Sequence, residues 1–308
     1  MAPCFVCRIP ATKHHVAGSK YKIPIKNQNK NLPTLLQIMK KSLSLLAVIA
    51  IATAGASAQD KIVIKGSDTL GAKMLPQLSE AYKAAGNEAN FEIAAEGSSS
   101  AFTNLLAGTA DIGMSSRDVK DSEKNEFTSK GMDLKEHVAG ADIIAVVLNE
   151  ANKISELTLE QVEGIFTGDI SDWSEVGGLP GAISVYTRNT ASGTYKSFQE
   201  MAMNNRDYGA DSQKMAGNEQ IAEEVSKNAN GIGYVGLAYA GKDGIKSAKI
   251  DGHEADPKEV DSYPIARKLY YYTVAGKVSE AAAKFLEWAM SDDVAKKVVE
   301  RVGFIPNK

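Results

Sequence analysis

The sequence predicts an α/β fold, and two observations support that prediction. Short runs of β-branched and other apolar residues, such as Lys61–Ile64, are typical of strands. Between such runs lie segments whose apolar residues recur every three or four positions. Leu70, Met74, Leu78 and Tyr82 follow this spacing, which places them on one face of a helix. Strands and helices that alternate along a chain favour a layered α/β sheet.

The remaining elements follow the same two patterns in chain order. The uninterrupted apolar run Ile143–Leu148 indicates a strand that is buried on both faces. The other expected strands are Phe91–Ala94, Ile112–Met114, Ile183–Tyr186, Gly233–Val235 and Leu269–Val274. The expected helices contain Phe102, Leu105 and Leu106; Leu159, Val162, Ile165 and Phe166; Tyr195–Met203; Ile221–Ser226; Ala282, Phe285, Leu286 and Ala289; and Val294, Val298 and Val302.

The N-terminal region has the pattern of a targeting segment. Lys40 and Lys41 precede an apolar run over residues 43–54, and Ala56-Ser57-Ala58 then provides an A-x-A cleavage site. The apolar run is too short to span a bilayer, which needs about 20 residues. We therefore expect residues 39–58 to be a signal peptide that is cleaved after Ala58. Because a signal peptide normally begins at its own Met, we expect residues 1–38 to come from an over-long gene prediction.

Charge and cysteine content differ on the two sides of this cleavage site. Eight of the 35 basic residues, and none of the 38 acidic ones, precede residue 59, so the rest has 27 basic residues and a net charge of −11. Such an acidic body disfavours binding of nucleic acid. Cys4 and Cys7 both precede the cleavage site, so the exported chain has no cysteine for a disulfide, thiol chemistry or a lipid anchor.

Small hydroxyl residues gather at three expected helix starts. The three segments are Gly66–Leu70, Gly97–Ser100 and Ser192–Thr194. A helix start offers unpaired N–H groups, hydroxyls add further donors, and glycine permits close backbone approach. Together these segments would form a neutral cage for a small tetrahedral oxyanion. Each cluster taken singly is also what an ordinary helix cap requires.

Two arginines lie beside these clusters. Arg117 follows Ser115 and Ser116, and Arg188 stands four residues before Ser192. A guanidinium is a planar fork that matches two oxyanion oxygens. Each arginine has the alternative of a surface position or an ordinary ion pair.

The sequence offers little for catalysis or for a metal. After residue 58 only His137 and His253 remain, and they lack the H-x-x-x-H spacing of a zinc site. The chain has no G-x-S-x-G elbow and no G-x-x-x-x-G-K-[ST] phosphate loop. The glycine-rich segment Gly231–Gly236 leads into a strand, whereas a dinucleotide fingerprint follows one. We expect no catalytic residue, metal or cofactor.

These motifs resemble those of the periplasmic phosphate-binding proteins of ABC transporters. The resemblance lies in Gly66–Thr69, Asp111–Asp118, Leu157–Trp173, Arg188–Thr194 and Gly303–Pro306, and it covers nearly all of 60–308 in order. It implies a two-lobed type II periplasmic-binding-protein fold, with the ligand in a cleft between lobes joined by a two-strand hinge. Lobe 1 would be 60–143 plus 270–308, and lobe 2 would be 144–269.

The resemblance also implies a ligand set. The Thr69 hydroxyl, the Leu70 N–H, Ser98, Arg188, Ser192, Gly193 and Thr194 match phosphate ligands of the family. Ser116 is also expected to bind phosphate, although it stands where well-known members have an Asp that accepts a hydrogen bond from protonated phosphate. The acceptor would then be Asp68 or, second, Asp118, although either could instead be a cap or an ion-pair partner of Arg117. Further candidates that flank the site are Ser67, Ser99 and Arg117.

The function implied is capture of inorganic phosphate by hinge closure and its delivery to an inner-membrane ABC permease. The protein would be a periplasmic monomer, not membrane-embedded and not an enzyme. The alternative is a binding protein for sulfate, molybdate or tungstate, which need no carboxylate acceptor. A secreted phosphatase is less favoured because no activated nucleophile is present, and a structural or adhesive role would not explain the hydroxyl clusters.

Overall fold

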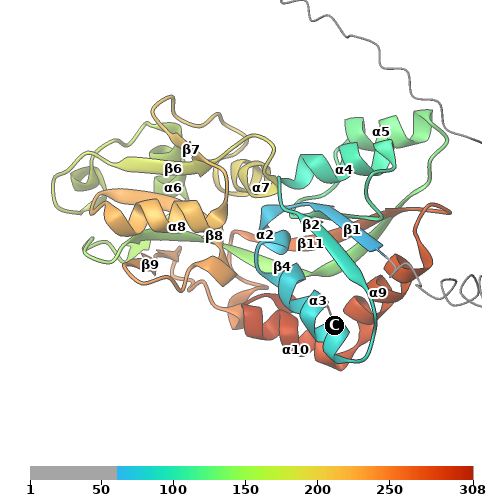
Figure 1. Ribbon diagram of the computed structural model, residues 1–308. Helices are drawn as coiled ribbons and strands as arrows, with labels where there is room; N and C mark the ends of the chain where they lie inside the picture. The colour runs from blue at the N-terminus through green and yellow to red at the C-terminus, as the bar shows by residue number, and fades with distance from the viewer. Residues whose placement is uncertain (1–60, 308) are drawn as a thin grey trace, which may run out of the picture. The chain divides into compact units, whose positions relative to one another are not determined.

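The computed structural model describes residues 61–307 and shows a mixed α/β fold, which confirms the predicted fold class (Figure 1). The main sheet of this part of the chain runs in the order β2-β1-β3-β11-β4-β8-β6-β7, and β12 and β9 also pair with β4. The strands are β1 (Lys61–Gly66), β2 (Asn90–Ala94), β3 (Ile112–Ser115), β4 (Leu134–Asn149), β5 (Glu156–Leu157), β6 (Ser184–Arg188), β7 (Gln213–Met215), β8 (Gly231–Gly236), β9 (Ile245–Ser247), β10 (Lys249–Ile250), β11 (Ala266–Val274) and β12 (Ile305–Pro306).

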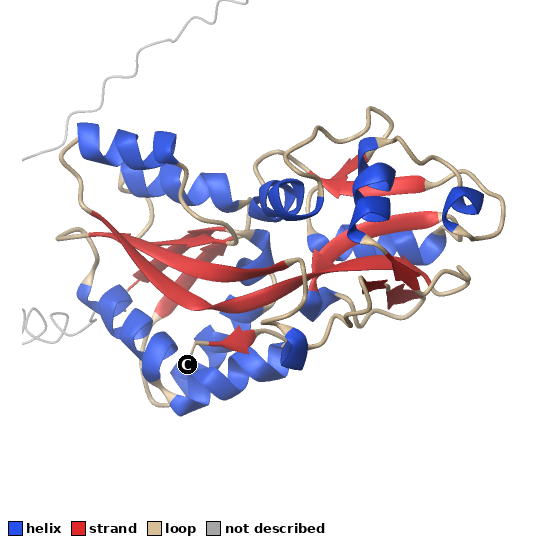
Figure 2. Cartoon of the chain, turned by 180° about the vertical axis from the view of Figure 1, so that it is seen from behind, coloured by secondary structure: helices blue, strands red, loops and turns tan. Residues whose placement is uncertain are grey.

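The helices pack on both faces of this sheet (Figure 2). They are α2 (Asp68–Gly71), α3 (Met74–Ala84), α4 (Ser98–Ala107), α5 (Asp121–Ser129), α6 (Leu159–Thr167), α7 (Gly193–Ala202), α8 (Asn218–Lys227), α9 (Glu280–Ser291) and α10 (Asp293–Val302), with short 3-10 turns at Trp173–Val176, Leu237–Tyr239 and Pro257–Glu259. Several of these helices begin at residues whose side chains cap them. Thr158 and Gln161 form a capping box at the start of α6, and Ser192 caps α7.

Strand β4 runs through the middle of the sheet and has different partners along its length. Residues 134–143 pair antiparallel with β11, whereas residues 144–149 pair with β8 and β9. The first half of the sheet, as we call it, consists of β2, β1, β3, β11 and residues 134–143 of β4. The second half consists of residues 144–149 of β4 with β8, β6 and β7.

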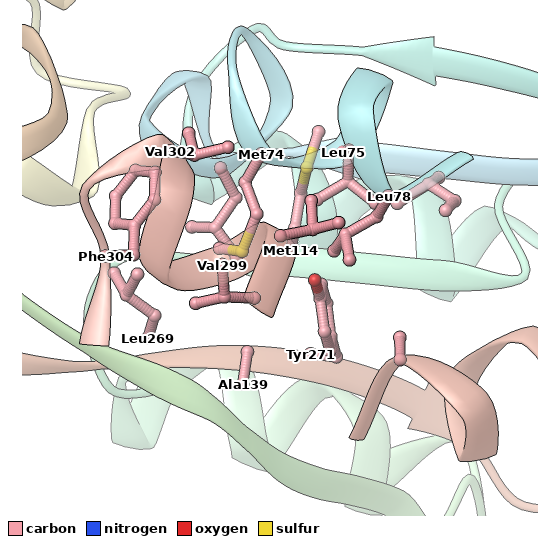
Figure 3. Packing of buried hydrophobic residues seen from close by; sticks show 14 of the residues in the cluster. Met74, Leu75, Leu78, Met114, Ala139, Leu269, Tyr271, Val299, Val302 and Phe304 are labelled. Atoms are coloured by element: carbon pink, nitrogen blue, oxygen red, sulfur yellow. The ribbon is translucent and has the colours of Figure 1, made fainter. Parts of the chain in front are cut away.

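The core lies between the sheet and its helices. In the first half, α3, α9 and α10 cover one face, while α4 and α5 cover the other. In the second half, α8 lies on one face and α6 and α7 on the other. Figure 3 shows Met74, Leu75 and Leu78 of α3 facing Met114 of β3, with Val299 of α10 beside them.

The structure adds five short strands that were not predicted, β5, β7, β9, β10 and β12, and it differs from the sequence-based prediction in three longer elements. The helix expected through Leu70 and Tyr82 is broken into α2 and α3, because Pro76 has no N–H to donate and is tolerated only in a first helical turn. Strand β4 extends well beyond Ile143–Leu148. Helix α5 was not predicted, since Phe127 is its one buried residue and no apolar periodicity marks it.

The expectations for residues 1–38, for the signal peptide at 39–58 and for its cleavage after Ala58 lie outside the described residues. Within residues 61–307 no helix is long and apolar enough to cross a membrane.

We predict that Phe304→Ala lowers the free energy of unfolding by about 3–5 kcal/mol, because the ring is buried and its removal leaves a cavity under α10. The matched control is Val294→Ala on α10, whose side chain is 50% exposed and whose loss should change stability by less than about 0.5 kcal/mol. Urea unfolding of both variants measures this, and equal effects would contradict the packing described.

Candidate functional site

The three hydroxyl-bearing helix starts meet in one buried region between the two halves of the sheet. The Thr69 hydroxyl on α2 lies 3.0 Å from the Thr194 hydroxyl on α7. The Ser98 hydroxyl on α4 lies 3.3 Å from the Ser116 hydroxyl and accepts a hydrogen bond from the Ser116 N–H at 3.0 Å. All four side chains are at most 1% exposed. The segments that the sequence singled out separately are therefore neighbours in space.

Close backbone approach brings α4 and α7 together. Gly97, at φ 116°, packs so closely on the carbonyl of Ala191 that a Cβ there would stand 2.7 Å from its oxygen. The Ser99 N–H donates to that same carbonyl at 3.2 Å. Gly193 faces Ser98 and Ser116, and a Cβ at 193 would overlap the Ser98 hydroxyl. Glycine is required at both positions because a side chain would push the helix starts apart.

Arg188 ends β6 and is 1% exposed. Its Nη2 donates to the Ala216 carbonyl at 2.9 Å, and its Nη1 lies 3.2 Å from Oδ2 of Asp68. Among the described residues, its Nε and Nη1 have no hydrogen-bond acceptor. Burial lowers the pKa of Arg188, and the charge of Asp68 opposes that shift. A buried guanidinium with two donors unused beside a hydroxyl cluster is suited to an anion.

Asp68 connects the two halves of the sheet. Its Oδ2 accepts hydrogen bonds from the N–H of Asn218 at 3.0 Å and from the Asn218 side chain at 2.7 Å. It thereby caps α8 as well as facing Arg188. From the sequence, Asp68 could have been a helix cap or an ion-pair partner of Arg117. In the structure it is both a cap and an ion-pair partner, but the arginine that it pairs with is Arg188.

Arg117, Ser99 and Asp118 belong to a separate contact set. Arg117 binds Glu123 through both guanidinium ends, at 2.6 Å and 2.8 Å, and donates to the Ser99 hydroxyl at 3.2 Å. It also packs over the Phe102 ring. Burial and a hydrogen bond with Asp118 raise the pKa of the Tyr270 hydroxyl. Arg117 and Asp118 are therefore engaged by partners that lie outside the hydroxyl cluster.

The other candidates lie at the ends of the same elements. Leu70 is buried in the core, and its N–H is in the first turn of α2. Ser67 precedes α2 and donates its N–H to the Met114 carbonyl at 2.7 Å. The Ser192 hydroxyl accepts from the Tyr195 N–H, so it caps α7.

Sequence reasoning missed a second buried ion pair at the site. Arg267 of β11 donates to Oδ2 of Asp142 on β4 at 2.8 Å, and it reaches the Ser116 carbonyl at 2.9 Å. Asp142 is 0% exposed and also accepts from the Leu237 N–H. Burial raises the pKa of Asp142, whereas the charge and hydrogen bonds of Arg267 oppose that rise. The available signal was an acidic residue directly before the apolar run at 143–148.

Among the described residues, the arrangement offers hydrogen-bond donors and buried positive charge. Within residues 61–307 no group of three His, Cys, Asp or Glu side chains could hold a metal ion. Hydroxyls, helix-start N–H groups and a guanidinium can together hold a small tetrahedral oxyanion.

The fold and the site together define a two-lobed α/β binding protein. Residues 52–293 match the family model described as a PBP superfamily domain, and the chain belongs to that superfamily. It is 31% identical to the phosphate-binding protein PstS of Pseudomonas aeruginosa, over 78% of this chain and 81% of the relative. That similarity places it within the family of phosphate-binding proteins. A Staphylococcus aureus PstS is 28% identical over 78% of this chain and 76% of the relative.

Solved structures agree with this assignment. A Clostridium perfringens structure, described as a phosphate ABC transporter substrate-binding protein with bound phosphate, is 32% identical with a TM-score of 0.75 and covers 81% of this chain and 100% of its own. An ABC-type phosphate transport receptor from Vibrio cholerae is 26% identical with a TM-score of 0.66, covering 80% and 100%.

We predict that Arg267→Met lowers the free energy of unfolding by about 3–5 kcal/mol, because it leaves the Asp142 carboxylate buried without a counter-charge. The pKa of Asp142 then rises further above its unfolded value. The folded state retains a proton that the unfolded state releases, so stability falls as the pH rises above about 4.

The double variant Asp142→Asn with Arg267→Met is the control. It removes the unpaired charge, so most of the lost stability and its added pH dependence should be recovered. Urea unfolding between pH 4 and pH 8 measures both variants. A single variant that is no more sensitive to pH than the double variant would contradict the pairing.

Proposed function

We propose that the protein is a periplasmic solute-binding protein that captures inorganic phosphate by closure of two lobes and delivers it to an ABC permease. The observation that supports this most is the buried Arg188, whose Nε and Nη1 lack an acceptor among the described residues, beside hydroxyls from three helix starts. The names of the relatives, and the phosphate bound in the C. perfringens structure, favour phosphate as the anion.

The proposed lobes are 60–143 plus 270–308 and 144–269. They are joined by β4, which runs through both halves of the sheet, and by the chain that enters β11 at the boundary between the halves. Two contacts join these lobes: Thr69 lies against Thr194, and Asp68 lies against Arg188. Such contacts exist only when the lobes are together. A ligand that contacts both lobes at once binds the closed state more tightly than the open state, so it shifts the protein towards the closed state.

The proposed ligands are the Thr69 hydroxyl, the Leu70 N–H, Ser98, Ser116, Arg188, Ser192, Gly193 and Thr194. A protonated phosphate also needs a hydrogen-bond acceptor, which sulfate does not. We assign this role to Asp68, because it lies against Arg188 and receives its hydrogen bonds from Asn218 at Oδ2. Its second oxygen can then accept from the phosphate. Asp118 is less suited because it is engaged with Tyr270.

The location and partners follow from the same proposal. A signal peptide at 39–58, cleaved after Ala58, would export the chain to the periplasm as a monomer. There it would meet the inner-membrane permease subunits. We propose no enzymatic activity, since the site provides donors without an activated nucleophile.

Calorimetric titration of ligand-stripped protein with phosphate, sulfate, molybdate and tungstate tests the proposal. We expect one phosphate to bind per chain without a sulfate response, because Asp68 would face a deprotonated anion with no donor between them. Sulfate or molybdate binding in place of phosphate would establish the alternative ligand class. No response to any of the four would contradict oxyanion binding.

We predict that Arg188→Ala weakens phosphate binding by well over tenfold, because it removes a charge-assisted contact from a buried site. Arg206→Ala is the control, since Arg206 forms ion pairs with Glu163 and Asp169 at the surface. Its affinity for phosphate should match that of the wild type. Unchanged affinity in Arg188→Ala would place Arg188 outside the site.

A further inference from the structure

The Thr69 hydroxyl has two neighbours that neither the sequence nor the family resemblance assigned to the site. The Asn218 side chain donates to the Thr69 Oγ1 atom from Nδ2 at 3.4 Å. Arg267 donates to the same oxygen from Nη2 at 3.5 Å. The third neighbour, the Thr194 hydroxyl, is 3.0 Å away and can either donate or accept.

The orientation of the Asn218 amide is determined by its other contacts. Its Oδ1 accepts a hydrogen bond from the Gly236 N–H at 3.1 Å. The opposite end is therefore the NH₂ group, which donates to Asp68 at 2.7 Å and to Thr69. Exchanging the amide oxygen and nitrogen would place an oxygen against the Asp68 carboxylate and an NH₂ against the Gly236 N–H. Asn218 can consequently meet Thr69 only as a donor.

Arg267 can also meet Thr69 only as a donor, because a guanidinium has no acceptor atom. Asp142 fixes its position through hydrogen bonds from Nε and Nη2, at 3.3 Å and 2.8 Å. The two donors thus reach Thr69 from groups that are each held by a carboxylate: Asn218 by Asp68, and Arg267 by Asp142. Asn218 is fully buried and Arg267 nearly so, so water does not substitute for them.

A threonine hydroxyl has one hydrogen to donate and two lone pairs to accept with. Two incoming donors occupy both lone pairs of Thr69, which leaves its hydrogen pointing at a third group. In the structure that group is Thr194, and in the complex it would be an oxyanion oxygen. A hydroxyl held in this way presents only a donor to the ligand.

We propose that Asn218 and Arg267 are positioning residues that fix the Thr69 hydroxyl as a hydrogen-bond donor to the bound oxyanion. The proposal rests on the phosphate-binding function proposed above. It also bears on selectivity. The oxygen of phosphate next to Thr69 must be an unprotonated one, so the P–OH group is directed elsewhere in the site, towards the Asp68 carboxylate.

A double-mutant cycle tests whether Asn218 acts through Thr69. The full chain, stripped of ligand, is prepared as wild type, Asn218→Ala, Thr69→Val and the double variant, and each is titrated with inorganic phosphate. Valine keeps the shape of threonine and removes the hydroxyl. The cycle isolates the coupling between the two residues from the contact that Asn218 makes with Asp68, which is lost in both backgrounds.

We expect Asn218→Ala to weaken phosphate binding about tenfold in the wild type and less than about threefold in the Thr69→Val background. In a Thr69→Ser background, which restores the hydroxyl, the full loss should return. Asn228→Ala is the matched control, because Asn228 lies at the other end of α8 and donates to Tyr186. It should show no coupling with Thr69→Val.

Equal losses from Asn218→Ala in both backgrounds would overturn the proposal, since they would mean that Asn218 only supports α8 and Asp68. If circular dichroism shows that Asn218→Ala is not folded, Asn218→Ser replaces it in the same cycle and the same comparison decides. Absence of phosphate binding by the wild type would instead overturn the proposed function. The two failures are therefore distinguishable.

Discussion

Two buried arginine–carboxylate pairs hold together the segments that form the site. Arg188 with Asp68 and Arg267 with Asp142 each join residues that are far apart in the sequence, and all four side chains are largely withdrawn from water. A buried charge is costly unless it is paired and hydrogen-bonded. Each pair therefore constrains where its strands and helix starts can lie, and the hydroxyl cluster depends on that placement.

The two pairs contribute differently. Arg267 lies at the start of β11 and Asp142 lies on β4, the strand that runs through both halves of the sheet. Their polar atoms find partners in each other, in nearby backbone groups and in the Thr69 hydroxyl. Arg188 keeps two donors without an acceptor among the described residues, although Asp68 faces it. The Arg267–Asp142 pair therefore supports the geometry of the site, while the Arg188–Asp68 pair leaves positive charge available to an anion.

Much of the fold could be predicted from sequence because its signals are local. Helix starts at Ser98 and Gly193 follow from hydroxyl and glycine residues, and the run Ile143–Leu148 indicated a buried strand. The break before α3 could also have been predicted from Pro76. The start, end and partners of β4 could not, because pairing with β11 and β8 is set by residues more than 80 positions away.

The same distinction applies to the site. The sequence singled out Thr69, Ser98, Arg188 and Thr194 because each stands in a recognisable local motif, and the structure brings them together. Asn218 and Arg267 stand in no such motif. Their contacts with Thr69 join residues 149 and 198 positions apart, so nothing near them in the chain indicates that they meet.

In the proposed function, a bound oxyanion draws the two lobes together around Arg188. Small-angle X-ray scattering of ligand-stripped protein, with and without saturating phosphate, measures this most directly. We expect phosphate to lower the radius of gyration, and chloride at the same ionic strength to leave it unchanged. A radius of gyration that is unchanged while calorimetry shows phosphate bound would contradict it.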